Sequence, residues 1–129
     1  MQVLFVEDDP MNRRVVRDML DVGGIRMNEA ADGPSGLAMI DSDDYDVVLM
    51  DLRMPGMDGL TAIGHLRSRH DDKARLPVIV ITADTSPNLR EECIAAGADE
   101  MLLKPVSMQD LFDTIGRLVS ERGGKTLFF

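Results

Sequence analysis

Acidic side chains follow two apolar segments of this chain, at positions where they could bind a divalent cation together. Residues 7–9 are all acidic and come directly after Val3–Val6, and Asp51 directly follows Val47–Met50. Short apolar runs that end in polar turns indicate buried parallel strands, and ligands bind at the carboxyl ends of such strands in open α/β sheets. Carboxylates crowded at that edge repel one another, by about 4 kcal/mol per pair at about 4 Å. A hard divalent cation relieves this repulsion, and ligands that are all oxygen atoms suit Mg²⁺ better than Zn²⁺.

Strand and helix signals alternate along the chain, without a linker, a repeat or a low-complexity segment. Helical apolar spacing follows each of the expected strands, which lie at about residues 3–6, 25–30, 46–50, 78–81 and 101–103. Helix starts are expected at Asp32, at Ser86–Pro87 and at Ser107, because Asp and Ser cap helices and Pro suits the first turn. This alternation predicts an α/β domain in which a parallel sheet carries helices on both faces. Segment 25–30 is more polar than the others and is expected at a sheet edge.

Length and composition exclude several classes of function. The 129 residues fit one domain, and the net charge of −9 without a basic stripe argues against a nucleic-acid surface. No apolar stretch approaches the roughly 18 residues of a membrane span, and the N-terminus lacks the pattern of a signal peptide. The single cysteine, Cys93, excludes an intrachain disulfide and is expected to pack in the core. The expected setting is therefore cytoplasmic, with neither nucleic acid nor a membrane as partner.

Several short signals in a fixed order give the chain a resemblance to a known family. They are Glu7-Asp8 after the first expected strand, Asp51 within the run DLRMPGMDG, Thr82 after the fourth strand, and Lys104-Pro105 after the fifth. Together they resemble the response-regulator receiver domains of bacterial two-component and phosphorelay signalling, which include chemotaxis regulators. The resemblance covers about residues 2–121 and implies a single (βα)₅ doubly wound, flavodoxin-like parallel sheet of strand order 2-1-3-4-5. A receiver domain is expected over residues 1–122, followed by a C-terminal tail over residues 123–129.

The resemblance implies a Mg²⁺ site built from the acidic residues. Asp8 and Asp51 would bind the ion directly, Glu7 would hold a water bound to it, and the backbone carbonyl of Arg53 would complete the protein ligands. The register follows from Arg13, which in the family lies five positions after the metal-binding aspartate. Asp9 is left with two interpretations, as an added negative charge or as the cap of the first helix, and the cap is favoured.

The resemblance also implies phosphoryl chemistry. Asp51 would accept a phosphoryl group from a phosphohistidine or a small phosphodonor, since a carboxylate can form a covalent acyl phosphate. Lys104 would place its positive charge next to the phosphoryl oxygens, and a cis peptide bond to Pro105 would orient the lysine. Thr82 would offer its hydroxyl to a phosphoryl oxygen once Asp51 is modified. Catalysis at such a site consists mostly of positioning and charge neutralisation.

Three positions depart from the family pattern or vary within it. The strand-five position that usually carries an aromatic switch residue is Met101, three before Lys104, and methionine is flexible and specifies a conformation less well. Arg53, two after Asp51, and Asp84, two after Thr82, carry opposite charges. They could form a pair across the mouth of the site, or both could be solvated.

The leading functional hypothesis is a phosphorylatable signalling switch rather than an enzyme, with weak autophosphorylation and autodephosphorylation. Its partners would be a histidine kinase or a histidine phosphotransfer protein, and a downstream protein that binds the face of the fourth helix, fifth strand and fifth helix. A monomer or weak dimer is expected, either free-standing or as a receiver from a hybrid histidine kinase. An aspartyl-phosphate hydrolase of the haloacid-dehalogenase type is disfavoured, because its second aspartate is replaced by Arg53. A pseudo-receiver is disfavoured because the site residues are intact.

Overall fold

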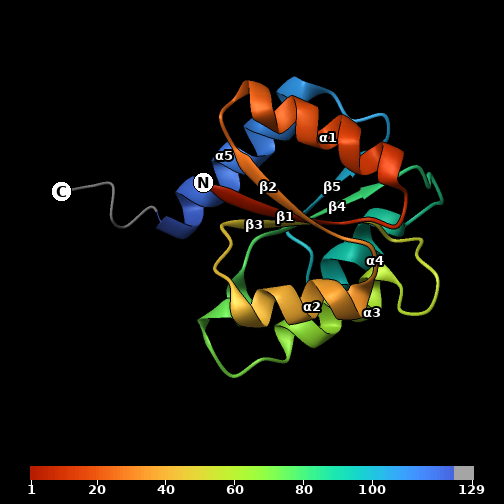
Figure 1. Cartoon of the computed structure of the whole chain (residues 1–129). Helices are drawn as coiled ribbons and strands as arrows, with labels where there is room; N and C mark the ends of the chain where they lie inside the picture. Colours follow the sequence, from red (N-terminus) through yellow and green to blue (C-terminus); the bar gives the residue numbers. More distant parts are fainter. Residues whose placement is uncertain (124–129) are drawn as a thin grey trace.

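Five apolar segments form one parallel sheet in the strand order β2-β1-β3-β4-β5 (Figure 1). The computed structural model describes residues 1–123, and its strands are β1 Gln2–Val6, β2 Arg26–Ala30, β3 Val47–Met50, β4 Val78–Thr82 and β5 Glu100–Leu103. The connections contain the helices α1 Pro10–Val22, α2 Gly33–Ser42, α3 Gly59–Arg67, α4 Leu89–Ala96 and α5 Met108–Gly123, and the short 3₁₀ helix η1 Asp72–Arg75. The predicted strand order is confirmed, with the more polar β2 at an edge. Of the tail expected over residues 123–129, all but Gly123 lies outside the described residues.

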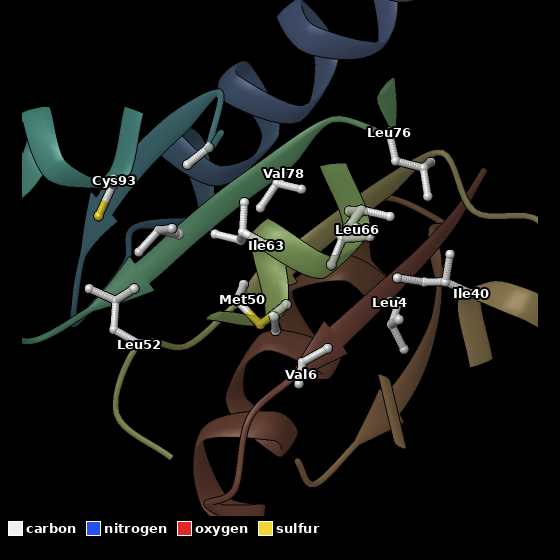
Figure 2. Close-up of a cluster of buried hydrophobic side chains, with 14 of the residues drawn as sticks. Leu4, Val6, Ile40, Met50, Leu52, Ile63, Leu66, Leu76, Val78 and Cys93 are labelled. Atoms are coloured by element: carbon white, nitrogen blue, oxygen red, sulfur yellow. The ribbon is translucent and has the colours of Figure 1, made fainter. Parts of the chain in front are cut away.

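Helices cover both faces of the sheet and enclose two apolar layers. α1 and α5 lie on one face, and α2, α3 and α4 lie on the other (Figure 1). Side chains alternate along each strand, so in β1 Leu4 and Val6 face the α2–α4 layer, while Val3 and Phe5 face α1 and α5. Figure 2 shows the α2–α4 layer, in which Ile63 of α3 lies among the strand side chains. Within residues 1–123, no helix is both long and apolar enough to cross a membrane.

Short polar side chains fix the starts of most helices. Asp9, Asp32 and Asp58 cap α1, α2 and α3, each through a carboxylate oxygen that accepts a main-chain N–H two or three residues further on. The hydroxyl of Ser107 accepts the N–H of Asp110 at 3.0 Å at the start of α5. The capping interpretation of Asp9 is therefore confirmed, as are the expected helix starts at Asp32 and Ser107.

The start of α4 differs from the prediction. Ser86 and Pro87 were expected to begin this helix, but it begins at Leu89, after Asn88 in the left-handed region with φ of 65°. The physical reason lies in the loop, where the carboxylate of Asp84 accepts hydrogen bonds from both the N–H and the hydroxyl of Ser86. These bonds hold Ser86 in a local turn, so it is not available as the helix cap.

The residues that follow the strands continue the hydrogen bonding of the sheet. The N–H of Asp51 donates to the carbonyl of Val6 at 3.0 Å, and the N–H of Lys104 donates to the carbonyl of Thr82 at 2.8 Å. The Lys104–Pro105 peptide bond is cis, as expected. Asp51, Thr82 and Lys104 are therefore held by the ordered edge of the sheet rather than by free loops.

The turn after β3 returns so closely that it requires glycine at its end. A Cβ atom on Gly59, the first residue of α3, would lie 2.3 Å from the carbonyl oxygen of Asp51 and 2.9 Å from the Cα of Leu52. Both atoms belong to backbone, so neither can move without shifting the chain at Asp51. Gly64, five residues further along α3, has open space where a Cβ atom would lie.

We expect Gly59→Ala to destabilise the fold by about 2–3 kcal/mol, because the added methyl group must displace backbone. Gly64→Ala is the matched control and should stabilise α3 by about 0.5–1 kcal/mol, because alanine is the better residue in the middle of a helix. Urea unfolding followed by circular dichroism measures both. Equal unfolding midpoints for the two variants would show that the close approach at Gly59 does not constrain the turn.

Candidate functional site

The carboxylates that follow β1 and β3 converge at one edge of the sheet. Because β1 and β3 are neighbours and Val6 pairs with Met50, the next residues of the two strands, Glu7 and Asp51, come side by side. Their residues are only 1% and 4% exposed, whereas Asp8 is exposed. Glu7, Asp8 and Asp51 each offer an oxygen that lies within 4.8 Å of the others. The predicted clustering of these carboxylates is therefore confirmed.

Lys104 provides a positive charge within this cluster. Its Nζ donates to the carboxylate of Glu7 at 2.7 Å and lies 3.4 Å from that of Asp51. Partial burial lowers the pKa of Lys104, but the hydrogen bond to Glu7 and the charge of Asp51 outweigh this effect and raise the pKa above its usual value. The lysine is thus held as an ammonium ion beside the two buried carboxylates.

Glu7 has further partners that sequence reasoning did not identify. The amide of Asn12 and the N–H of Asp9 donate to its carboxylate at 3.2 and 3.3 Å. The guanidinium of Arg13 donates to its main-chain carbonyl at 2.6 Å. The only sequence signal for these contacts is that Asn12 and Arg13 follow the cap of α1 closely enough for their side chains to turn back towards β1.

The donor set fits a magnesium ion by its chemistry. It consists of carboxylate oxygens alone, as Mg²⁺ prefers, and one of the three groups is solvent-facing, so water can complete an octahedral shell. Partial desolvation and the adjacent Glu7 carboxylate raise the pKa of Asp8. Desolvation is the larger cause of this shift, and the negative charge of Glu7, which a cation would offset, adds to it. Arg53, whose carbonyl is a further candidate ligand, lines the same cleft of about 680 Å³ as Asp8.

Thr82 ends β4 beside the cluster and is connected to the following loop. Its residue is 1% exposed, and its hydroxyl oxygen accepts the N–H of Asp84 at 3.1 Å. A hydroxyl has two acceptor positions and one proton, so Thr82 can still donate to a new acceptor. The structure therefore brings Thr82 to the same sheet edge as Lys104, with a hydroxyl proton left for a ligand.

Arg53 and Asp84 form an ion pair between the loops that follow β3 and β4. The hydrogen bonds from Ser86, together with the pair to Arg53, lower the pKa of Asp84 to about 2. The Arg53 side chain is 76% exposed, whereas that of Asp84 is 13% exposed. Of the two possibilities left open by the sequence, pairing is the one observed.

Met101 does not belong to the acidic cluster. It is half-buried on β5, packs against the α2–α4 layer, and its Sδ lies 4.0 Å from the Sγ of Cys93 on α4. Cys93 is fully buried, which confirms its expected packing, and this burial raises the pKa of its thiol. Met101 therefore contacts α4 rather than the phosphoacceptor candidate.

Comparison with known proteins agrees with this geometry. Residues 3–116 match the response regulator receiver domain family. The chain is 35% identical over 119 residues to hybrid signal transduction histidine kinase G of Dictyostelium discoideum, covering 91% of this chain and 4% of the relative. It is 40% identical over 111 residues to response regulator MprA of Mycobacterium avium, covering 86% of this chain and 47% of the relative. The chain thus spans less than half of the length of these curated relatives.

A solved receiver-domain structure is also similar to this chain. The receiver domain of sensor histidine kinase PA1611 from Pseudomonas aeruginosa PAO1, solved with a magnesium ion in its active site cleft, is 34% identical. It superimposes with a TM-score of 0.84, covering 92% of this chain and 97% of that one. The family match spans most of the chain, and the order of the strands and the acidic cluster agree with it. The chain belongs to the response regulator receiver domains of two-component signalling.

Proposed function

We propose that this receiver domain is a phosphorylation-dependent switch that accepts a phosphoryl group from a phosphohistidine donor onto Asp51 with Mg²⁺. The observation that carries the proposal is the position of Lys104, whose ammonium contacts both Glu7 and Asp51 at 2.7 and 3.4 Å. A carboxylate that is buried beside an ammonium and next to two further carboxylates has the environment that acyl-phosphate formation requires. The donor would be a histidine kinase or a histidine phosphotransfer protein.

The residues have separate tasks in the transfer. A carboxylate oxygen of Asp51 forms the new O–P bond while the P–N bond of the phosphohistidine breaks, and the imidazole nitrogen leaves with the electron pair. Lys104 neutralises charge on the transferred oxygens, as an ammonium does in other phosphate sites. A bound Mg²⁺, held by Asp8, Asp51 and the carbonyl of Arg53, with Glu7 holding a water bound to the ion, would supply further charge neutralisation. The domain remains a phosphoacceptor rather than a classical enzyme, with weak autophosphorylation and autodephosphorylation.

Output is proposed to proceed through Thr82 to the face formed by α4, β5 and α5. Thr82 has a hydroxyl proton for a phosphoryl oxygen, and its partner Asp84 lies in the loop that leads to α4. Met101 is the proposed switch residue, and its contact with Cys93 links β5 to α4. A downstream protein that binds this face more tightly in one state would shift the equilibrium between the two.

The cellular context is part of the proposal. Relatives include both a hybrid histidine kinase and a response regulator, so a receiver of either kind fits, acting in the cytoplasm as a monomer or weak dimer. A hydrolase of the haloacid-dehalogenase type has less support. Its acid/base position carries Arg53, whose guanidinium is paired with Asp84.

Asp51→Asn is expected to abolish phosphorylation, because the amide keeps the shape of the side chain but lacks the nucleophilic oxygen. Intact mass spectrometry after incubation with acetyl phosphate and Mg²⁺ measures the added phosphoryl mass. Asp44→Asn, at a fully exposed carboxylate, is the matched control and should be modified like the wild type. Modification of Asp51→Asn at the wild-type rate would refute the proposed acceptor.

Thr82→Ala is expected to take up the phosphoryl group but to lose most of the conformational response, because its hydroxyl bonds an oxygen that arrives only with that group. In the wild type, amide chemical-shift changes on phosphorylation should concentrate in residues 82–112, and in Thr82→Ala they should shrink. Thr82→Ser keeps the hydroxyl and should retain them. Shift changes confined to α1 and α2 would contradict the proposed output face.

Arg53→Ala and Asp84→Ala are each expected to speed hydrolysis of the acyl phosphate, by about two- to tenfold. The guanidinium of Arg53, paired with Asp84, restricts the access of water to the acyl phosphate in a way that two small residues cannot. The Arg53 side chain is 76% exposed, so the melting temperature of Arg53→Ala should change little. Arg75→Ala, at an exposed ion pair with Asp72 in η1, is the control. Purely additive effects in the Arg53/Asp84 double mutant would mean that the two residues do not act together.

A further inference from the structure

The side chain of Arg13 on α1 bonds to the main chain of the acidic turn, residues 7–9. Its guanidinium donates to the carbonyl of Glu7 at 2.6 Å, and its main-chain N–H donates to the carbonyl of Asp9 at 3.1 Å. The bond to Asp9 is an ordinary main-chain bond of the first turn of α1, which any residue at position 13 would make, so the contact made by the arginine side chain is the one to Glu7. Asp8 itself is exposed, so packing does not fix its carboxylate, and the direction of that carboxylate depends on the backbone that Arg13 holds.

Glu29 in turn fixes the guanidinium of Arg13. The Nε of Arg13 donates to Glu29 at 2.7 Å, and the Arg13 side chain is only 16% exposed. Glu29 pairs with Phe5 in the register of β1 and β2, so its position is set by the sheet. Arg17, one turn further along α1, forms an ion pair with the other carboxylate oxygen of Glu29. Partial burial raises the pKa of Glu29, but the bonds from Arg17 and Arg13 outweigh it and lower the pKa, which keeps the carboxylate charged.

We infer that Arg13 is a positioning residue that sets the Mg²⁺ affinity of the site by holding the Glu7–Asp9 turn, and that Glu29 acts through it. The inference rests on the proposed Mg²⁺-dependent function. Some groups orient the ligands of a metal without contacting the metal themselves. Their removal commonly lowers metal affinity by about 10- to 100-fold. Arg13 is suited to this task because a planar guanidinium can bond the carbonyl and the carboxylate in different directions at once.

Simple electrostatics predicts the opposite sign, which makes the inference testable. Arg13 is a cation near a cluster of carboxylates, so removal of its charge alone would strengthen the binding of a divalent cation. If Arg13 positions Asp8, removal of its side chain should weaken Mg²⁺ binding despite the favourable change in charge.

The experiment is a titration of the apo protein with Mg²⁺ alone, without phosphodonor, followed by the amide signals of residues 7–9. Arg13→Gln is expected to weaken Mg²⁺ binding about tenfold. Arg14→Gln removes the same charge from an exposed neighbour, which forms no ion pair within residues 1–123, and should change the affinity less than about twofold. Arg17→Gln breaks an ion pair to Glu29 but no bond to Glu7, and it should resemble Arg14→Gln more than Arg13→Gln.

Arg13→Lys is the second variant, to be used if Arg13→Gln does not fold. It keeps the positive charge but cannot bond the Glu7 carbonyl and the Glu29 carboxylate at once, as the guanidinium does. It should weaken binding about threefold. Mg²⁺ binding in Arg13→Gln or Arg13→Lys as tight as in Arg14→Gln would overturn the inference. Equal losses in Arg13→Gln and Arg17→Gln would also overturn it, because they would assign the effect to the α1–β2 ion pairs in general.

Asp8→Asn separates this inference from the proposed function. A large loss of affinity in Asp8→Asn, together with normal binding in the Arg13 variants, would overturn the role of Arg13 alone. Wild-type affinity in Asp8→Asn would overturn the proposed metal site, and the role of Arg13 with it.

Discussion

The interaction on which the site depends is the repulsion between carboxylates that the sheet forces together. Adjacent parallel strands β1 and β3 deliver Glu7 and Asp51 to one edge, where both are nearly inaccessible to water. A buried charge is costly unless it is paired. Lys104, delivered by β5, supplies the pairing charge at 2.7 Å from Glu7. The charges therefore remain in place only because three strands hold their side chains in fixed relative positions.

Much of this arrangement could be predicted because it depends on local pattern. Apolar runs such as Val47–Met50 locate buried strands, and the polar residue after each run must lie at the carboxyl edge of a parallel sheet. The resemblance to receiver domains then gave the strand order. The predicted start of α4 was wrong because Ser86 can either cap a helix or bond to a nearby side chain. In the structure it bonds to the carboxylate of Asp84 in the loop. Helix-capping propensity alone does not tell whether Ser86 caps a helix or bonds to a side chain two residues away.

Apart from the cluster at the sheet edge, side-chain contacts between distant segments could not be derived from the sequence. Arg13 meets Glu29 only because the register of β1 and β2 sets Glu29 opposite Phe5, beneath α1. Arg67 at the end of α3 similarly donates to the carbonyls of Gly97, Ala74 and Leu76. Each of these side chains has several polar groups within its possible reach, and the fold decides which are contacted. The pairing of Arg53 with Asp84 was one of two possibilities for the same reason.

Asp84 connects the site to the surface proposed for output. Its N–H donates to the hydroxyl oxygen of Thr82, while its carboxylate binds Arg53 and Ser86. A shift of Thr82 towards a phosphoryl oxygen would pull on the backbone of Asp84, and the carboxylate carries that displacement to Ser86, just before α4. In the proposed switch, the same shift would strain the pair with Arg53. In the proposed switch, the rate of acyl-phosphate hydrolysis and the position of α4 would therefore both depend on Asp84, because its bonds connect Thr82, Arg53 and Ser86.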